Sequence, residues 1–190
     1  MKRAFQALLI ASLSALALPQ ASAAVIDNGS FESVALGDGD SLRTTSLSGW
    51  NVDGFVRLID PAGNNALIDG DNVLRLRAGN GISQSLSLND AVRYTLSFAY
   101  RLSSSGDASF SVGGNTVDLA AGTRTYSYSF TGSSASSLLS FNADAGRLTL
   151  DNVSIAAAVP EPETYALMLA GLVMVGLYAR RRHRREHDAS

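Results

Sequence analysis

Residues 92–100 read VRYTLSFAY, and this stretch decides the fold class. Apolar side chains stand at nearly every second position, with Arg93, Thr95 and Ser97 between them. A period of two places the apolar side chains on one face of an extended strand, whereas an amphipathic helix has a period near 3.6. The stretch therefore predicts a half-buried β-strand.

The same alternation recurs in both directions from this stretch. It is found over residues 55–59, 73–78, 82–88, 108–112, 116–119, 124–130, 138–141 and 147–155, and more weakly over residues 25–31. Gly, Ser, Asn and Asp separate the segments, as expected of turns. We predict an all-β domain over residues 24–158, an antiparallel β-sandwich of eight or nine strands. The pattern alone does not separate an immunoglobulin-like sandwich from a jelly roll.

The apolar positions change parity within the last segment. Leu148 and Leu150 fall on one parity, whereas Val153 and Ile155 fall on the other. One extra residue in a strand shifts its side chains in this way. The sequence therefore predicts a β-bulge or a change of face at Asp151-Asn152.

Composition excludes several kinds of site. The 190 residues contain no cysteine, so disulfides and cysteine-ligated metal centres are impossible. The two histidines, His183 and His187, lie in the last eight residues. A histidine-dependent catalytic triad inside the β-domain is thereby excluded. Residues 24–158 contain eight Arg against thirteen Asp and Glu, a net charge of −5, which argues against nucleic-acid binding. We expect no enzyme.

Residues 1–23 have the pattern of a secretory signal peptide. Lys2 and Arg3 precede an apolar stretch, and Ala21-Ser22-Ala23 fits the small-residue cleavage rule. The apolar stretch is shorter than the roughly 18 residues of a membrane span, which disfavours the alternative of an N-terminal anchor. We expect export by the secretory pathway and a mature chain that begins near Ala24.

The C-terminal residues 159–190 have three parts. Pro160-Glu161-Pro162 comes first, the uncharged run 164–179 follows, and an arginine cluster closes the tail: Arg180, Arg181, Arg182, Arg184 and Arg185. As a helix the uncharged run would extend about 24 Å at ~1.5 Å per residue, and flanking arginines can snorkel to the interface. We predict a single transmembrane helix over residues 164–179, with the arginines on the cytoplasmic side. The alternative is a buried core helix with a solvated basic tail.

This order of features resembles the PEP-CTERM sorting signal of Gram-negative bacteria. The resemblance implies that the protein is a substrate of an exosortase, a membrane cysteine protease or transpeptidase. It further implies a precursor anchored in the inner membrane with its domain in the periplasm, and a final location at the cell surface or outside the cell. Proteins of this family often occur in bacteria that make exopolysaccharide, and the same resemblance therefore implies exopolysaccharide as a partner.

A second resemblance covers about residues 25–156. Two motifs resemble those of galactose-binding-like carbohydrate-binding modules. They are Asn28-Gly29-Ser30-Phe31-Glu32 near the mature N-terminus and Leu150-Asp151-Asn152-Val153 near the end of the domain. The resemblance implies a jelly roll, and it implies a structural Ca²⁺ held by Glu32 and Asp151. The alternative is that both are ordinary turn carboxylates. Ca²⁺ needs six to eight oxygen ligands, so carbonyls or water must complete the site.

Trp50, the only tryptophan, has two interpretations. Its ring could bind a sugar by stacking, or it could pack in the core. The acidic segments 38–40 and 69–72 lack the spacing of calcium loops and read as solvated turns. The favoured function is an exported, non-enzymatic surface or matrix protein associated with exopolysaccharide. The alternative is a carbohydrate-binding module with a sugar-stacking face.

Overall fold

A computed structural model describes residues 25–62, 70–158, 168–176 and 178 of the chain. The predicted signal peptide, Pro160-Glu161-Pro162 and the arginine cluster 180–185 lie outside the described residues.

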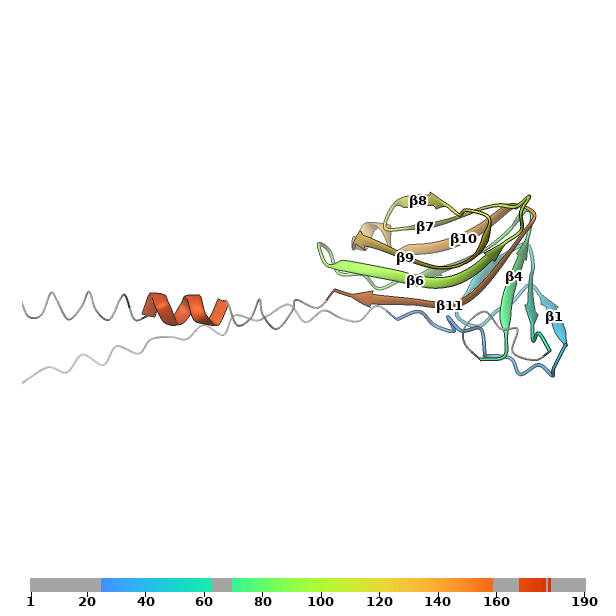
Figure 1. The fold of residues 1–190 in the computed structure, drawn as a ribbon, viewed down its shortest axis with the longest axis horizontal. Helices are drawn as coiled ribbons and strands as arrows, with labels where there is room; N and C mark the ends of the chain where they lie inside the picture. The colour runs from blue at the N-terminus through green and yellow to red at the C-terminus, as the bar shows by residue number, and fades with distance from the viewer. Residues whose placement is uncertain (1–24, 63–69, 159–167, 177, 179–190) are drawn as a thin grey trace, which may run out of the picture.

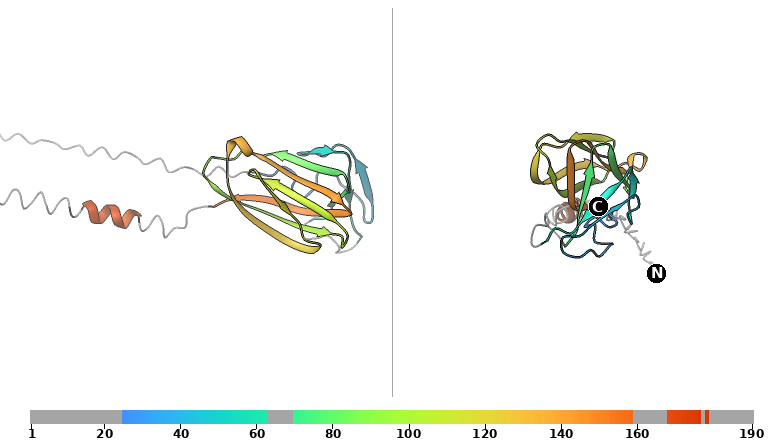
Figure 2. Two further views of the ribbon diagram at one scale, coloured as in Figure 1. Left: turned by 90° about the horizontal axis from the view of Figure 1, so that it is seen from above. Right: turned by 90° about the vertical axis from the view of Figure 1, so that its right-hand side faces the viewer.

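Two antiparallel sheets face each other across the core (Figures 1 and 2). In spatial order, the larger sheet contains β1 (Ser41–Thr44), β3 (Val56–Ile59), β4 (Val73–Arg77), β11 (Arg147–Ala157), β6 (Arg93–Leu102) and β9 (Gly122–Thr131). The smaller sheet contains β2 (Asn51–Asp53), β5 (Asn80–Ser85), β10 (Leu138–Ala145), β7 (Asp107–Val112) and β8 (Asn115–Asp118). A short 3₁₀ helix, Ser134–Ser136, precedes β10.

The strand order is that of a jelly roll. From β4 to β11 the chain passes from one sheet to the other at every connection except the β7–β8 hairpin, and β11 returns to lie between β4 and β6. The sandwich is therefore confirmed. The described residues contain eleven strands, more than the eight or nine predicted, because β1 and β2 are short and largely polar. The weak segment 25–31 forms turns instead of a strand.

The core sits between the sheets and is rich in aromatic rings. Phe98 of β6 is almost fully buried, and its ring centroid lies 5.0 Å from that of Phe141 and 5.3 Å from that of Phe110. Both contacts are edge-to-face, a favoured arrangement of two rings. These rings come from one strand of the larger sheet and two of the smaller, so they join the layers.

The predicted bulge lies in β11. Asp151 pairs with Ala99, and the next pair is Ser154 with Ser97, so β11 contains one extra residue at this point. Asn152 has a φ of 49°, in the left-handed region that asparagine tolerates. Leu150 before the bulge and Val153 after it are both buried, which confirms the parity change as a bulge.

The N-terminal segment docks onto this bulge. The Val153 N–H donates to the Gly29 carbonyl over 2.8 Å, and the Asn28 side chain donates to the Ser48 carbonyl over 2.9 Å. Glycine is required at position 29, because a Cβ there would collide with the Val153 carbonyl oxygen. The two segments that the sequence singled out at the ends of the domain are therefore in direct backbone contact.

Residues 168–176 and 178 are helical, and their side chains are exposed. Within the described residues, no helix has the length and hydropathy that a membrane crossing requires. The rest of the predicted span over 164–179 lies outside the described residues.

The close approach at Gly29 yields a stability prediction. Gly29→Ala should lower the free energy of unfolding by about 1–3 kcal/mol, because the added methyl group must displace backbone. Thermal unfolding of the mature chain would measure the change.

Gly37→Ala is the matched control, since the nearest atom to a Cβ at that position is a carboxylate oxygen of Asp40 at 3.1 Å, the movable end of a side chain. Equal melting temperatures for the two variants would contradict the conclusion that the close approach to Val153 requires glycine at position 29.

Candidate functional site

A hollow of about 470 Å³ lies beside the docked N-terminal segment. It is lined by residues of that segment, of the turn before β2, of β2 itself and of β5: Val25, Asp27, Leu47, Gly49, Trp50, Asn51, Gln84 and Ser85. Asp27 supplies its one carboxylate. This side chain lies against Gly49, where a Cβ would come within 2.9 Å of the carboxylate oxygen.

Gln84 of β5 organises the hollow. Its side-chain carbonyl accepts from the Asp27 N–H over 2.9 Å, and its amide group donates to the carbonyls of Asp27 and Gly49. The side chain is buried, and these bonds use both of its amide hydrogens. Gln84 therefore fixes the walls of the hollow and has no hydrogen left to donate to a ligand.

Trp50 lies in the core beneath this hollow. Its side chain is only 6% exposed, and its ring packs on Phe31 and Phe141 at centroid distances of 5.9 and 6.3 Å. The indole N–H donates to the Asn28 carbonyl over 3.1 Å. Burial leaves little of the ring face for a sugar. Among the described residues of the β-domain, every aromatic side chain is buried or half-buried.

Glu32 and Asp151 occupy different surroundings. Glu32 is exposed, and one of its carboxylate oxygens accepts from the N–H groups of Asp71 and Asn72 over 3.0 and 2.7 Å. Asp151 is fully buried on β11, and its carboxylate accepts from the Asn152 N–H over 2.7 Å. The structure brings their segments together through the bond between Gly29 and Val153.

Asn72 is a functional candidate that sequence reasoning missed. The residue is 1% exposed, and its amide nitrogen lies within bonding distance of the Phe31 and Val34 carbonyls and of the Glu32 carboxylate. Its side-chain carbonyl oxygen is buried without a hydrogen-bond partner. Such an atom is costly to bury and suits a ligand that supplies positive charge. An asparagine in a turn gives no hint of this in the sequence.

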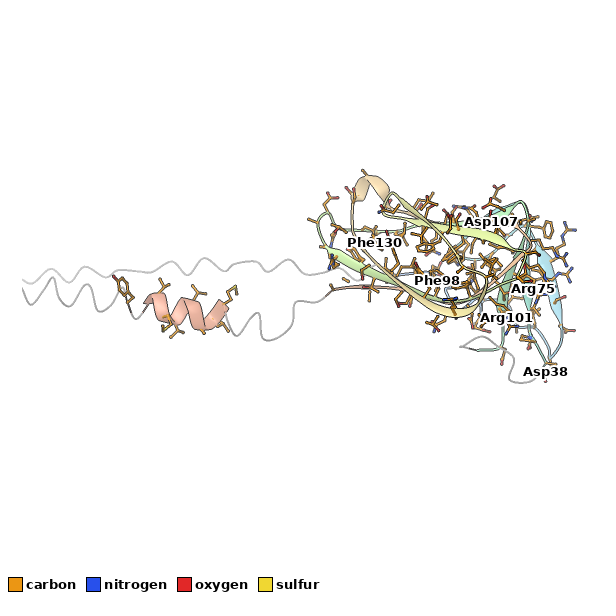
Figure 3. The ribbon with its side chains drawn as sticks, turned by 45° about the horizontal axis from the view of Figure 1, so that its top comes forward. Asp38, Arg75, Phe98, Arg101, Asp107 and Phe130 are labelled. Carbon is orange, nitrogen blue, oxygen red and sulfur yellow. The ribbon has the colours of Figure 1, made fainter. Side chains whose placement is uncertain are left out.

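Acidic side chains gather in the turns around β1, β3 and β4, close to Asn72 in the sequence or the fold. Asp60 is buried, and its pKa is raised first by loss of solvent and then by repulsion from Asp38, Asp71 and Asp40. Asp38 is labelled in Figure 3. Within residues 25–62 and 70–158, no group of three or more acidic or histidine side chains is arranged to hold a metal ion.

Comparison with known proteins gives two family matches. A family model described as HpiC1 cyclase matches residues 22–165, and a model of the PEP-CTERM protein-sorting motif matches residues 158–182. The second match confirms the sorting signal, which marks an exported protein sorted to the cell envelope or surface. No protein with a curated description matches the chain.

Many solved structures are similar to this chain at low identity, and three of them illustrate the range. A CBM22-1 xylan-binding domain of Paenibacillus barcinonensis Xyn10C is 21% identical over 67% of this chain and all of its own, with a TM-score of 0.44. TmCBM61, solved with β-1,4-galactotriose, is 14% identical over 72% of this chain and all of its own, with a TM-score of 0.48. Tailspike protein 4 of bacteriophage CBA120 is 17% identical over 70% of this chain, with a TM-score of 0.44, and the match spans 21% of the tailspike chain.

The acidic cluster yields a prediction about pH. Because the pKa of folded Asp60 lies above the ordinary value of 3.8, its contribution favours folding most below that pH and is lost as the pH rises through the folded pKa. Asp60→Asn removes the buried charge, so it should raise the melting temperature at pH 7. The difference from the wild type should shrink as the pH falls through the raised pKa of Asp60 and should be lost below about 4, where the carboxyl group is protonated in both the folded and the unfolded state.

Asp107→Asn on β7 is the control, because that carboxylate belongs to the other sheet. A variant at Asp60 that melts below the wild type at pH 7 would show that the carboxylate is stabilising.

Proposed function

The chain belongs to the HpiC1 cyclase family, and from its sorting motif we propose that it works as an exported, non-enzymatic surface or extracellular-matrix protein associated with exopolysaccharide. The observation that carries the proposal is the sorting motif, which follows the β-sandwich domain directly. The motif identifies the chain as a substrate of a protein-sorting system. A small β-sandwich domain at the surface of a cell that makes exopolysaccharide would be surrounded by that polymer.

An exosortase is the proposed processing partner. Pro160-Glu161-Pro162 and the arginine cluster 180–185 are the features that it would recognise. The uncharged run 164–179 would hold the precursor at the inner membrane, with the domain in the periplasm, until processing releases it. The arginines would keep the tail on the cytoplasmic side.

The burial of aromatic rings supports one of the two proposed modes of association with a polysaccharide over the other. A sugar-stacking site needs an exposed ring face, and Trp50 packs against Phe31 and Phe141. Tyr126 and Tyr128 are half-buried against the core. We therefore favour association through polar and charged contacts over a stacking platform.

The family name supports a second candidate, a ring-forming enzyme, and one observation favours it. The hollow beside Trp50 contains a carboxyl group, that of Asp27, which could transfer a proton as a general acid or base. Ring closure without loss of atoms gives an isomer of the starting compound. A host carrying Asp27→Asn would then accumulate the open-chain isomer, detectable by chromatography and mass spectrometry.

Fractionation of cells tests the proposed function. In a host that makes exopolysaccharide, the mature protein should be found mainly in the matrix or on the cell surface. In an isogenic host that makes none, the protein should move to the medium. A second exported protein with a signal peptide and no sorting motif is the control. An identical distribution in the two hosts would contradict association with the polymer.

We propose that Ca²⁺ stabilises the junction between the N-terminal segment and β11 through Glu32 and Asp151, with Asn72 as a further ligand. The buried, unpartnered carbonyl oxygen of Asn72 supports this, because Ca²⁺ binds oxygen ligands of this kind. The Glu32 carboxylate and the Val34 carbonyl lie beside Asn72, and Asp151 stands two residues before Val153, which bonds to Gly29 of the same N-terminal segment. Bound Ca²⁺ would neutralise the carboxylates there and hold the ends of the domain together.

Calcium should therefore raise the melting temperature of the mature chain, and a chelator should lower it. Binding to the folded state alone stabilises it by about 2.7 kcal/mol when free ligand is a hundredfold above the dissociation constant. Glu32→Gln and Asp151→Asn should abolish the rise. Asp118→Asn on β8, in the other sheet, should keep it. A wild-type melting curve that is the same in calcium and in chelator would refute the calcium site.

A further inference from the structure

A row of arginines crosses the larger sheet. The pairing register places one residue from each of the six strands side by side: Arg43, Arg57, Arg75, Thr149, Arg101 and Thr123, in the order β1, β3, β4, β11, β6 and β9. Arg77 and Arg147 form a second cross-strand pair two residues along β4 and β11. We call these six arginines the arginine face.

The arginine face is the outer side of the sandwich. Leu58, Leu74 and Leu148 are next to its members along their strands, and all three are fully buried in the core. Successive side chains of a strand point to opposite faces of the sheet. The arginines therefore point away from the core, and Figure 3 shows Arg75 and Arg101 near one another at one end of the domain.

A hollow marks the middle of this face. It has a volume of about 140 Å³ and is lined by Arg75, Arg101, Ser103, Arg147 and Thr149. Three guanidinium groups and two hydroxyl groups thus border one small space. Among the described residues, its walls contain hydrogen-bond donors and no carboxylate, which suits an anionic group bearing neighbouring hydroxyls.

The contacts that the structure gives the arginine face are with neutral groups. Within residues 25–62 and 70–158, none of the six arginines forms an ion pair. Arg57 donates to the Ser41 hydroxyl over 3.4 Å and Arg101 to the Thr123 hydroxyl over 3.0 Å. Arg43 lies 3.6 Å above the centre of the Phe55 ring. Each of these partners is neutral.

Mutual repulsion acts within the face. The pKa of Arg75 is lowered, first by partial burial and then by its four neighbours Arg147, Arg77, Arg57 and Arg101. Like charges directly opposite one another on adjacent strands are destabilising, and Arg57 stands opposite Arg43 on one side and Arg75 on the other. A bound anion would relieve this repulsion.

We propose that the arginine face binds an acidic, carboxylate-bearing polysaccharide, and this inference rests on the proposed association with exopolysaccharide. Guanidinium groups bind carboxylates through two parallel hydrogen bonds. Adjacent strands lie about 4.8 Å apart, so the row presents cations at intervals on the scale of one sugar ring. A linear polymer with a carboxylate on each sugar can lie across the strands and meet successive arginines.

Charge and location favour this polymer over other polyanions. The domain over residues 24–158 has a net charge of −5, so an extended anionic membrane would also meet its acidic parts, whereas a single linear chain can contact the arginine face alone. An exported protein meets extracellular polysaccharide more readily than nucleic acid. Six of the eight arginines of residues 24–158 belong to the arginine face. Thr149 and Thr123 place hydroxyl groups in that row, where they can bond to sugar hydroxyls.

The test measures binding of the mature chain, in nonionic detergent, to polygalacturonate and to neutral dextran of similar length. The wild type should bind polygalacturonate and not dextran, and rising salt should weaken the binding. Arg75→Gln combined with Arg101→Gln should weaken it roughly tenfold, or about 1.4 kcal/mol. The matched control is Arg93→Gln combined with Arg124→Gln, which removes the same charge outside the face and should leave the affinity unchanged.

Each other outcome overturns the inference. An equal loss of affinity for polygalacturonate in the two double variants would mean that only the net charge of the domain matters. Equal binding of dextran and polygalacturonate would mean that the carboxylates are not recognised. Binding to vesicles containing anionic lipid in place of polygalacturonate would make the face a membrane contact. A negative result in these binding measurements does not change the outcome expected of the fractionation experiment. Matrix association that persists in the Arg75/Arg101 variant would uphold the proposed function through another surface.

Discussion

The pairing of β11 with both β4 and β6 is the interaction on which the rest of the structure depends. The last strand of the domain enters the middle of the larger sheet, between strands far apart in the sequence. Without β11 that sheet would be two separate pieces, and the leucines that it contributes to the core would have no place. The bulge within β11 then creates the notch into which the backbone at Gly29 fits. The docked segment in turn forms one wall of the hollow at Asp27 and brings Glu32 to Asn72.

Much of this architecture was accessible from alternation alone. The period-two pattern predicted the strands that carry the core, and the parity change at Asp151-Asn152 predicted the bulge. The pattern did not predict β1 and β2, because strands of three or four residues with few apolar side chains show no periodicity. Topology between the two sheets was left open by the pattern, since local alternation is the same in every antiparallel sandwich. The words shared with carbohydrate-binding modules favoured the jelly roll that the strand order has.

The candidate sites were less accessible, because each depends on pairing between distant segments. Nothing in the sequence aligns Arg57, Arg75 and Arg101, which come from three strands and become neighbours only through strand register. The unpartnered oxygen of Asn72 is likewise a property of how the N-terminal segment packs. Trp50 had two interpretations in the sequence, and its contacts with Phe31 and Phe141 place it in the core. Sequence reasoning thus identified residues of note and could not say which would be adjacent.

The position of β11 also has a mechanical consequence. This strand is the element that leads into the C-terminal tail, and its last residues are tied to the start of β6, where the Ala158 N–H donates to the Arg93 carbonyl. A pull on the tail is transmitted along the axis of a strand that is bonded on both sides. Its ladder bonds run across that axis, so they resist the load together in shear and do not open one at a time. The domain therefore receives a pull on its C-terminal end at a strand that is paired on both sides.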